Sequence, residues 1–296
     1  MALIEVTHFS DPGCPWAYSA SPALAVLRWR YGSQLRWRHV MIGLTESAEQ
    51  YVARGYTPVR ATLGYGRYAR RYGMPFARHP RARMIATGRA CRAVVAVRLA
   101  HPERELAAFR ALQFAWFTSS ALLDEDDVLE AVLDEVPGVD GAAARAALED
   151  PRVLDAYEAD RAEARTAAGS ATEFQGKAAQ TDGPVRYTAP SLIFSAPGGT
   201  RLEAGGFQPI EAYDVVLANL DHSLVRAPAA EDPVEVLERF PDGLTTRELA
   251  ATMAAGNDPV DDERAEVALI EALGTARVER RSLGDGALWR ATSQTD

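Results

Sequence analysis

The sequence predicts an α/β fold whose sheet is interrupted by a large helical insertion, with a small second domain after it. Three observations carry this expectation. Strand patterns at residues 3–9 and 35–42 enclose a helical pattern, as in a β-α-β unit. The pattern is helical from about 58 to 168. Strand, turn and helix patterns return between 189 and 222, so segments on both sides of the insertion build the sheet.

Length and composition fit two globular domains. The chain has 296 residues, of which 47% are apolar and 25% charged, which suits one large and one small domain. The segment Arg226–Ala230 has the composition of a linker. It separates a first domain at residues 1–225 from a second at 231–296. No apolar run approaches the ~20 residues of a membrane helix, so we expect no membrane contact.

The first strand leads through a tight turn to a cysteine at the start of a helix. Cys14 follows Asp-Pro-Gly, and Pro15 stands where the first helical residue is expected, a position that tolerates its missing N–H. Cys14 therefore falls at the N-cap, where the free N–H groups of Trp16 and Ala17 and the helix dipole favour a thiolate. We expect a reactive thiol with a lowered pKa. The alternative is a small buried hydrophobic residue.

The next elements complete the β-α-β unit. The helix at residues 15–31 is expected to kink at Pro22, which lacks a backbone donor. The alternating pattern at 35–42 predicts a second strand. A β-α-β unit of this kind pairs its two strands in parallel through a right-handed crossover.

The insertion is predicted to contain several helices separated by prolines. They are expected at residues 83–100, 103–118, 124–135, 141–149 and 151–168. Residues 169–188 are polar and predicted to be loop. A strand at 189–194, a hairpin partner at 200–203 and a helix at 209–222 complete the domain. Pro190, at the start of that strand, is a candidate for a cis peptide bond.

The cysteine motif lacks a second thiol. A dithiol motif needs Cys-x-x-Cys, but position 17 is alanine. Cys91, the only other cysteine, lies in an expected helix, so we expect no Cys14–Cys91 disulfide and a reducing, cytoplasmic setting. We expect no metal and no tightly bound cofactor, because no phosphate-binding loop occurs and the histidines lack ligand spacing. These histidines are His8, His39, His79, His101 and His222.

Charge is distributed unevenly along the chain. Residues 28–98 contain fifteen arginines and two acids, a net charge of +13, whereas residues 231–296 contain seven arginines and fifteen acids, a net charge of −8. Solvated helix faces are one explanation. The other is that the basic stretch attracts an anionic thiol or disulfide, or the acidic C-terminal segment.

The C-terminal segment has the element order of a winged helix-turn-helix. Helices are expected at residues 233–240, 245–251 and 261–273, followed by strands at 278–281 and 287–290. The second helix has a capping box of a threonine and a glutamate three residues later. The acidic balance opposes contact with phosphates, so we expect no nucleic acid. We expect this domain to pack on the first or to form a homo-oligomeric or heteromeric contact.

These motifs resemble the DsbA-like branch of the thioredoxin superfamily, which includes kappa-class glutathione transferases and 2-hydroxychromene-2-carboxylate isomerases. The resemblance spans about residues 1–222. It rests on Asp11–Tyr18, on the position of the helical insertion, on Ala189-Pro190 and on Gly205–Pro209. It implies a thioredoxin-like fold with a large helical insertion, followed by the small winged-helix-like domain.

The resemblance also implies site residues. Cys14 takes the place of the family's nucleophilic cysteine and Pro190 that of its cis-proline, and both are expected to be catalytic. Alanine at position 17 departs from the dithiol members and is closer to the transferase and isomerase members, which place a single serine or cysteine at the site. The expected substrate-binding residues are Pro15, Trp16, Ala17, Ala189, Phe207 and Gln208.

We therefore expect a monothiol thiol–disulfide oxidoreductase or thiol transferase. Cys14 would form a mixed disulfide with a small or protein substrate, and glutathione or another low-molecular-weight thiol would resolve it as cosubstrate. Two alternatives stay open. In a glutathione-transferase- or isomerase-like enzyme, Cys14 would donate a hydrogen bond to a bound thiolate without a covalent step. The second alternative is a non-catalytic protein-binding adaptor. It rests on the similarity to adaptors of the ClpXP protease, which also join a DsbA-like domain to a small C-terminal domain.

Overall fold

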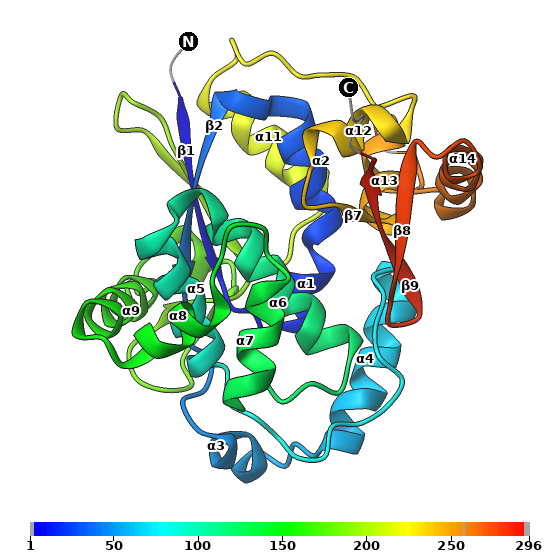
Figure 1. Cartoon of the computed structure of the whole chain (residues 1–296). Coiled ribbons are helices and arrows are strands. Elements are labelled where there is room, and N and C mark those ends of the chain that lie inside the picture. Colours follow the sequence, from blue (N-terminus) through cyan, green and yellow to red (C-terminus); the bar gives the residue numbers. More distant parts are fainter. Residues whose placement is uncertain (1–2, 257, 293–296) are drawn as a thin grey trace.

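The computed structural model describes residues 3–256 and 258–292, so the outermost residues of the two predicted domains lie outside it. The first domain is built on a four-stranded sheet with the order β2-β1-β5-β6 (Figure 1). As predicted, β1 (Ile4–Ser10) pairs in parallel with β2 (Leu35–Met41). On its other side it pairs antiparallel with β5 (Ser191–Ser195), which forms a hairpin with β6 (Arg201–Ala204). The predicted α/β class is confirmed.

The predicted helix at residues 15–31 is divided into α1 (Pro15–Ser19) and α2 (Ser21–Tyr31). The break lies at Ala20, which ends one helix and caps the next, and not at Pro22. This shift places Pro22 in the first turn of α2, where its missing N–H costs no helical hydrogen bond.

Helices cover both faces of the sheet. On one face α2 and α11 (Ile210–Leu220) pack against the strands through buried aliphatic side chains. The insertion covers the other face, and its core is a large cluster of buried aliphatic and aromatic residues. Its helices are α3 (Ala48–Ala53), α4 (Pro58–Tyr72), α5 (Gly88–Ala100), α6 (Glu105–Thr118), α7 (Asp126–Asp134), α8 (Gly141–Ala146) and α9 (Pro151–Ala164), with 3-10 turns at Pro102–Arg104 and Ala147–Glu149. Another 3-10 turn, Gly32–Gln34, connects α2 to β2.

Residues 169–188, predicted to be loop, contain short regular elements. They are α10 (Ala171–Phe174), β3 (Ala178–Ala179) and β4 (Arg186–Tyr187), the last two forming a small antiparallel ladder. Strands of two residues are too short for a period-two pattern to reveal. Within the described ranges, no helix is long and apolar enough to cross a membrane.

The C-terminal segment contains three helices and a three-stranded sheet with the order β7-β9-β8. Thr245 caps the second helix and forms the predicted capping box with Glu248. The identification of this segment as a winged helix-turn-helix stays a prediction. Its elements are α12 (Pro233–Arg239), β7 (Leu244–Thr245), α13 (Thr246–Met253), α14 (Asp262–Gly274), β8 (Val278–Leu283) and β9 (Gly286–Ala291).

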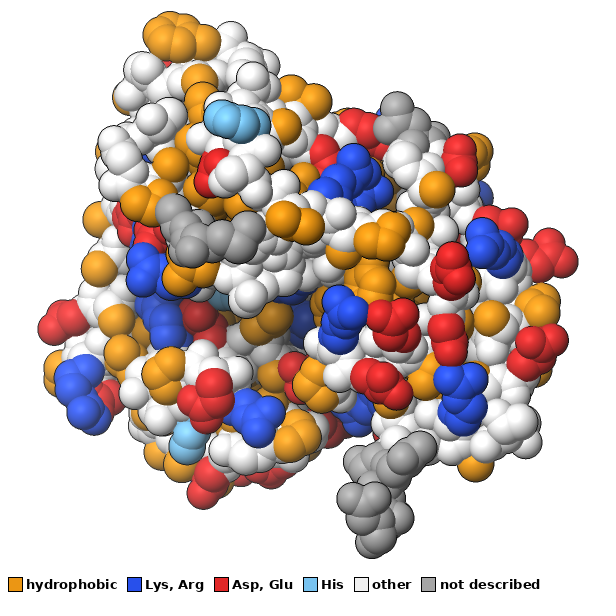
Figure 2. Space-filling model, turned by 90° about the horizontal axis from the view of Figure 1, so that it is seen from above, with side chains coloured by type: hydrophobic (Ala, Val, Ile, Leu, Met, Phe, Trp, Pro, Cys, Tyr) orange, Lys and Arg blue, Asp and Glu red, His pale blue; other side chains and the backbone are white. Residues whose placement is uncertain are grey.

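This segment packs on the first domain, which is one of the two arrangements expected from the charges. In Figure 1 the β8–β9 hairpin reaches toward α4, and its turn residue Asp285 accepts a hydrogen bond from Phe76 N at 2.8 Å and pairs with Arg78 at 2.6 Å. The fully buried Glu248 forms an ion pair with Arg110 of α6 at 2.6 Å. Figure 2 shows acidic side chains spread over the right-hand side of the molecule, where Figure 1 places the C-terminal elements.

The Arg110–Glu248 pair leads to a prediction for stability. We expect Glu248→Gln to lower the free energy of unfolding by about 3 kcal/mol, because the guanidinium of Arg110 loses its buried partner. Urea denaturation measures the change. The control is Glu235→Gln, which breaks the exposed Arg239–Glu235 pair and should cost under ~0.5 kcal/mol. Equal, small effects of the two variants would contradict the assignment.

Candidate active site

Cys14 lies in the wall of a cavity of about 390 Å³. The cavity is bounded by the turn before α1, by α4, by the segments on either side of α4 and by the chain just before β5. Its lining is rich in aromatic and basic side chains. The aromatic members are Trp16, Tyr51, Tyr56, Tyr65, Tyr68 and Trp116, and the basic members are Arg54, Arg60, His79, Arg81, Arg83 and Arg186.

The thiol of Cys14 faces the start of β5. Cys14 is the N-cap residue of α1, as predicted, and only 5% of it is exposed. Its Sγ donates a hydrogen bond to the carbonyl oxygen of Ala189 at 3.1 Å. The Ala189-Pro190 bond is cis, also as predicted. Antiparallel pairing of β1 with β5 therefore brings the cysteine turn and the proline segment together from opposite ends of the domain.

The expectation of a lowered pKa for Cys14 is wrong. Burial raises the pKa of the thiol to about 12, and the negative charge of Asp11 adds to this increase. The N–H groups of Ala17 and Trp16 and the charge of Arg186 lower the pKa, but by less. A helix N-terminus contributes about 0.3–1 kcal/mol at an exposed site, whereas burial shifts a pKa by up to 3–5 units, so desolvation outweighs the helix.

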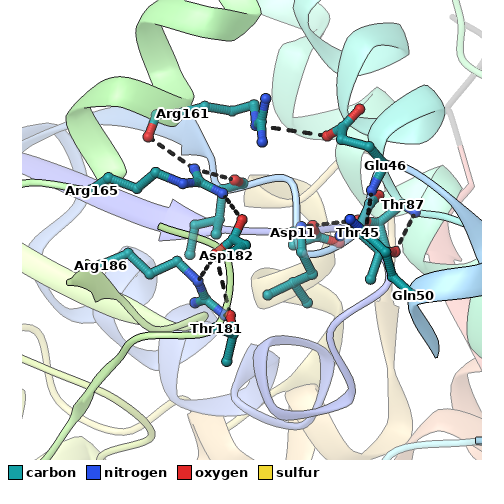
Figure 3. Close-up of polar contacts among 12 residues, drawn as sticks. Asp11, Thr45, Glu46, Gln50, Thr87, Arg161, Arg165, Thr181, Asp182 and Arg186 are labelled. Carbon is teal, nitrogen blue, oxygen red and sulfur yellow. Dashed lines mark hydrogen bonds and ion pairs between the residues drawn. The ribbon is translucent and has the colours of Figure 1, made fainter. Parts of the chain in front are cut away.

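Asp11 holds the turn that carries Cys14. Its buried carboxylate accepts hydrogen bonds from Gly13 N, Leu44 N and Thr87 Oγ1, each at 2.8 Å. The thiol of Cys91, on α5, donates to the same carboxylate at 3.4 Å. Figure 3 shows Asp11 close to Thr87 at the centre of this polar group. The carboxylate thus ties the cysteine turn to the loop after β2 and to α5.

Gly13 is required by a close approach at the same turn. A Cβ at this position would lie 2.5 Å from Cγ2 of Thr87 and 2.9 Å from the ring of Trp116. Contacts this short do not occur between real side chains, so only glycine allows the turn to lie against α5 and α6. Both Cys14 and Cys91 are free thiols, and Cys91 acts as a hydrogen-bond donor inside the protein.

Arg186 brings a positive charge to the thiol. It lies on β4, lines the cavity and pairs with Asp182 at 3.5 Å. Asp182 also pairs with Arg165, and Figure 3 shows the three side chains in a row facing the Asp11 group. Arg186 is not among the site residues expected from the sequence, because the polar pattern of residues 169–188 predicts a loop. The one available signal, an arginine four residues before Pro190, is weak.

Three further arginines in the cavity have no carboxylate partner among the described residues. Arg60 donates to the carbonyl oxygen of Gly55 at 2.7 Å, and Arg54 also has only a carbonyl acceptor. Arg81 lies over the ring of Trp116, 5.0 Å from its centroid. Within the part of the chain that the structure describes, no Asp or Glu lines the cavity. The site is therefore electropositive and suited to an anion.

The structure brings only some of the predicted site residues together. Pro15, Trp16 and Ala189 line the cavity with Cys14. Ala17 faces a separate, smaller cavity behind α1. Ala17 still contacts the thiol from within the protein, because it shares a buried apolar cluster with Cys14 and its backbone N–H lowers the pKa of Cys14.

Phe207 and Gln208 also lie outside the cavity of Cys14. They line a neighbouring groove beside α2 and α11. The Phe207 ring lies 5.7 Å from Trp16 and 4.8 Å from Tyr72, measured between centroids, so it supports the outer side of Trp16. The Gln208 amide donates to the carbonyl oxygen of Gly205 at 2.7 Å and stabilises the turn before α11.

A thiol at the start of a helix, opposite a cis-proline at the start of a strand, on a sheet with this order, defines a thioredoxin-fold protein. Residues 5–168 match the family model described as the DSBA-like thioredoxin domain. This match covers more than half of the chain. The chain therefore belongs to the DsbA-like thioredoxin family. No curated protein shows significant sequence similarity to it.

Solved structures share the fold. A candidate protein disulfide isomerase from Nitrosomonas europaea superposes with a TM-score of 0.56 at 18% identity, covering 73% of this chain and 97% of that one. A probable DsbA oxidoreductase from Streptomyces coelicolor gives 0.52 at 20% identity, with 77% and 93% covered. The cytosolic disulfide reductase DsbM from Pseudomonas aeruginosa gives 0.51 at 19% identity, with 73% and 100% covered.

The role of Asp11 leads to a prediction for the thiol. We expect Asp11→Asn to lower the pKa of Cys14 by about one unit or more, because a like charge near the thiolate disappears. The rate of alkylation against pH, followed on the peptide that contains Cys14, measures it. The matched control is Asp150→Asn, a change in the exposed N-cap of α9, which should leave the midpoint unchanged. A midpoint that stays or rises in Asp11→Asn would contradict the role given to this carboxylate.

Proposed function

We propose that this protein is a thiol–disulfide oxidoreductase that acts through Cys14 on low-molecular-weight thiols and disulfides carrying negative charge. The observation that carries the proposal is the cavity itself. It places a single thiol in a space of about 390 Å³ lined by arginines, a size typical of small-molecule sites. Three solved structures with the same fold are described as a disulfide isomerase, an oxidoreductase and a cytosolic disulfide reductase, which supports redox chemistry in a reducing compartment.

The proposed reaction has two exchange steps. The Cys14 thiolate attacks one sulfur of a bound disulfide, the S–S bond breaks, and the second sulfur leaves as a thiolate that takes up a proton. The thiolate of a second small thiol then attacks the substrate sulfur of the mixed disulfide. Cys14 leaves as a thiolate, and the two small thiols leave joined as a disulfide, so the electrons balance without another reductant.

The cavity residues have distinct roles in this reaction. Arg54, Arg60 and Arg81 bind the carboxylates of the ligand, and Trp16 packs on its apolar part. Arg186 stabilises negative charge on sulfur as the S–S bond breaks. Because the thiol is neutral in the empty site, the rate of the first step should rise with pH toward the pKa of Cys14.

A second candidate function has a specific observation in its favour. The raised pKa of Cys14 and the hydrogen bond from its Sγ to Ala189 indicate a protonated thiol that acts as a hydrogen-bond donor. Such a thiol can donate to the sulfur of a bound thiolate without a covalent step, as in the transferase- and isomerase-like alternative. A non-catalytic protein-binding adaptor is a third candidate, and an experiment must distinguish it from the two enzymatic functions.

Intact mass spectrometry after incubation with glutathione disulfide tests the proposal. We expect one glutathione per chain, linked to Cys14 and absent in Cys14→Ser, with Cys91→Ser as the matched control that keeps the adduct. Uncharged hydroxyethyl disulfide should react about tenfold more slowly, because it cannot use the arginines. Tight binding of reduced glutathione without any adduct would favour the hydrogen-bond mechanism instead. Neither an adduct nor binding would contradict both enzymatic proposals.

A further inference from the structure

A second cavity lies behind α1, where α2, α6 and the C-terminal segment meet. Its volume is about 40 Å³, and it shares no lining residue with the cavity of Cys14. The polar lining comes from β1, α2 and α6, and the apolar lining includes Phe240 and Leu244 of the C-terminal segment. The polar members that matter here are His8, Arg28, Arg110 and Gln113.

Several polar atoms at this cavity have no partner. Across the residues that the structure describes, Nη2 of Arg28, Nε2 of Gln113 and both ring nitrogens of His8 are buried without a hydrogen bond. His8 and Gln113 are each only 2% exposed. A buried donor left unsatisfied costs about 1–3 kcal/mol, so several of them around one small space indicate an occupant that accepts hydrogen bonds.

The cavity also has unbalanced positive charge. The Arg28 guanidinium lies 4.0 Å from the centroid of the Trp37 ring and forms no ion pair with any described residue. Arg110 is already paired with Glu248, and Asp242, which lines an adjoining groove, also acts on Arg110 and not on Arg28. Burial and the charge of Arg110 lower the pKa of Arg28 to about 9, which leaves it charged at neutral pH.

His8 adds no counter-charge. Burial lowers the pKa of His8 well below its usual value, so the ring is neutral and offers one N–H. No Asp or Glu lines this cavity in the described part of the chain. Water would satisfy the free donors but would add no negative charge to offset that of Arg28, whose pKa burial lowers.

We propose that this cavity binds one small monovalent anion of halide size, held by Arg28, Gln113 and His8. The volume exceeds what one water needs and is about a tenth of that of the cavity of Cys14, so the proposed occupant is a single small ion. An open groove of about 280 Å³, lined by Arg28, Arg110 and Phe240, adjoins it and provides a route from solvent. Since Phe240 and Leu244 close the cavity, the anion also stabilises the docking of the C-terminal segment.

Thermal unfolding of the full chain tests this site. We expect the Tm to rise with the logarithm of the bromide concentration as sodium bromide replaces sodium gluconate at constant ionic strength, because only the folded state binds bromide. Gluconate is too large for the cavity. Gln113→Leu keeps the charge of Arg28 and removes one donor, so about tenfold more bromide should be needed for the same rise in Tm.

Two arginine variants complete the test. Arg28→Met should abolish the bromide-dependent rise, whereas Arg67→Met, a change at an exposed arginine of α4, should retain it. Crystals soaked in bromide should show an anomalous peak between Arg28 and Gln113. No difference between bromide and gluconate in the unchanged protein, or an equal rise in both arginine variants, would overturn the proposal. If Arg28→Met fails to fold, an unchanged bromide response in Gln113→Leu, or an empty cavity in the soaked crystals, would overturn it.

Discussion

The thiol site depends on one buried carboxylate. Asp11 joins the cysteine turn to the loop after β2 and to α5 through four donors, so the position of Cys14 is set by residues far apart in sequence. The same carboxylate places a negative charge near the thiol and raises its pKa. The group that organises the site therefore also opposes ionisation of its nucleophile.

The pKa of Cys14 depends on the balance between burial and the helix N-terminus, and this balance decides whether the thiol ionises in the empty site. Exposed cysteines at helix N-termini gain from the dipole and from free N–H groups, but Cys14 is buried beneath a large aromatic cavity. Desolvation outweighs the helix, and the thiol is neutral in the empty site. Arg186 lowers the pKa of the thiol by less than burial raises it, so we expect the positive charges of the cavity to act mainly on a ligand that brings a second sulfur or a carboxylate. An arginine-lined cavity thus selects the ligand before the thiol reacts.

Much of the fold could be predicted from local patterns. One local pattern is the strand and turn that lead to Cys14 and Pro15. Another is the capping box at Thr245, which could be predicted because capping depends on residues a few positions apart. The site could be predicted only in part. Burial of Cys14 and the nearness of Arg186 arise from tertiary packing, and no sequence period reports on them. For the same reason Phe207 and Gln208 proved to line a neighbouring groove.

In the ligand-free protein Cys14 is a buried thiol whose raised pKa keeps it neutral. The most direct measurement is a pH titration of its Cβ carbon by NMR, with 13C-labelled cysteine in the full chain and Cys91→Ser to assign the signal. We expect a midpoint well above the ~8.5 of an ordinary cysteine, with a single neutral-thiol shift throughout neutral pH. A midpoint near 7 or below would show that the helix N-terminus outweighs burial, and would contradict a neutral thiol in the empty site.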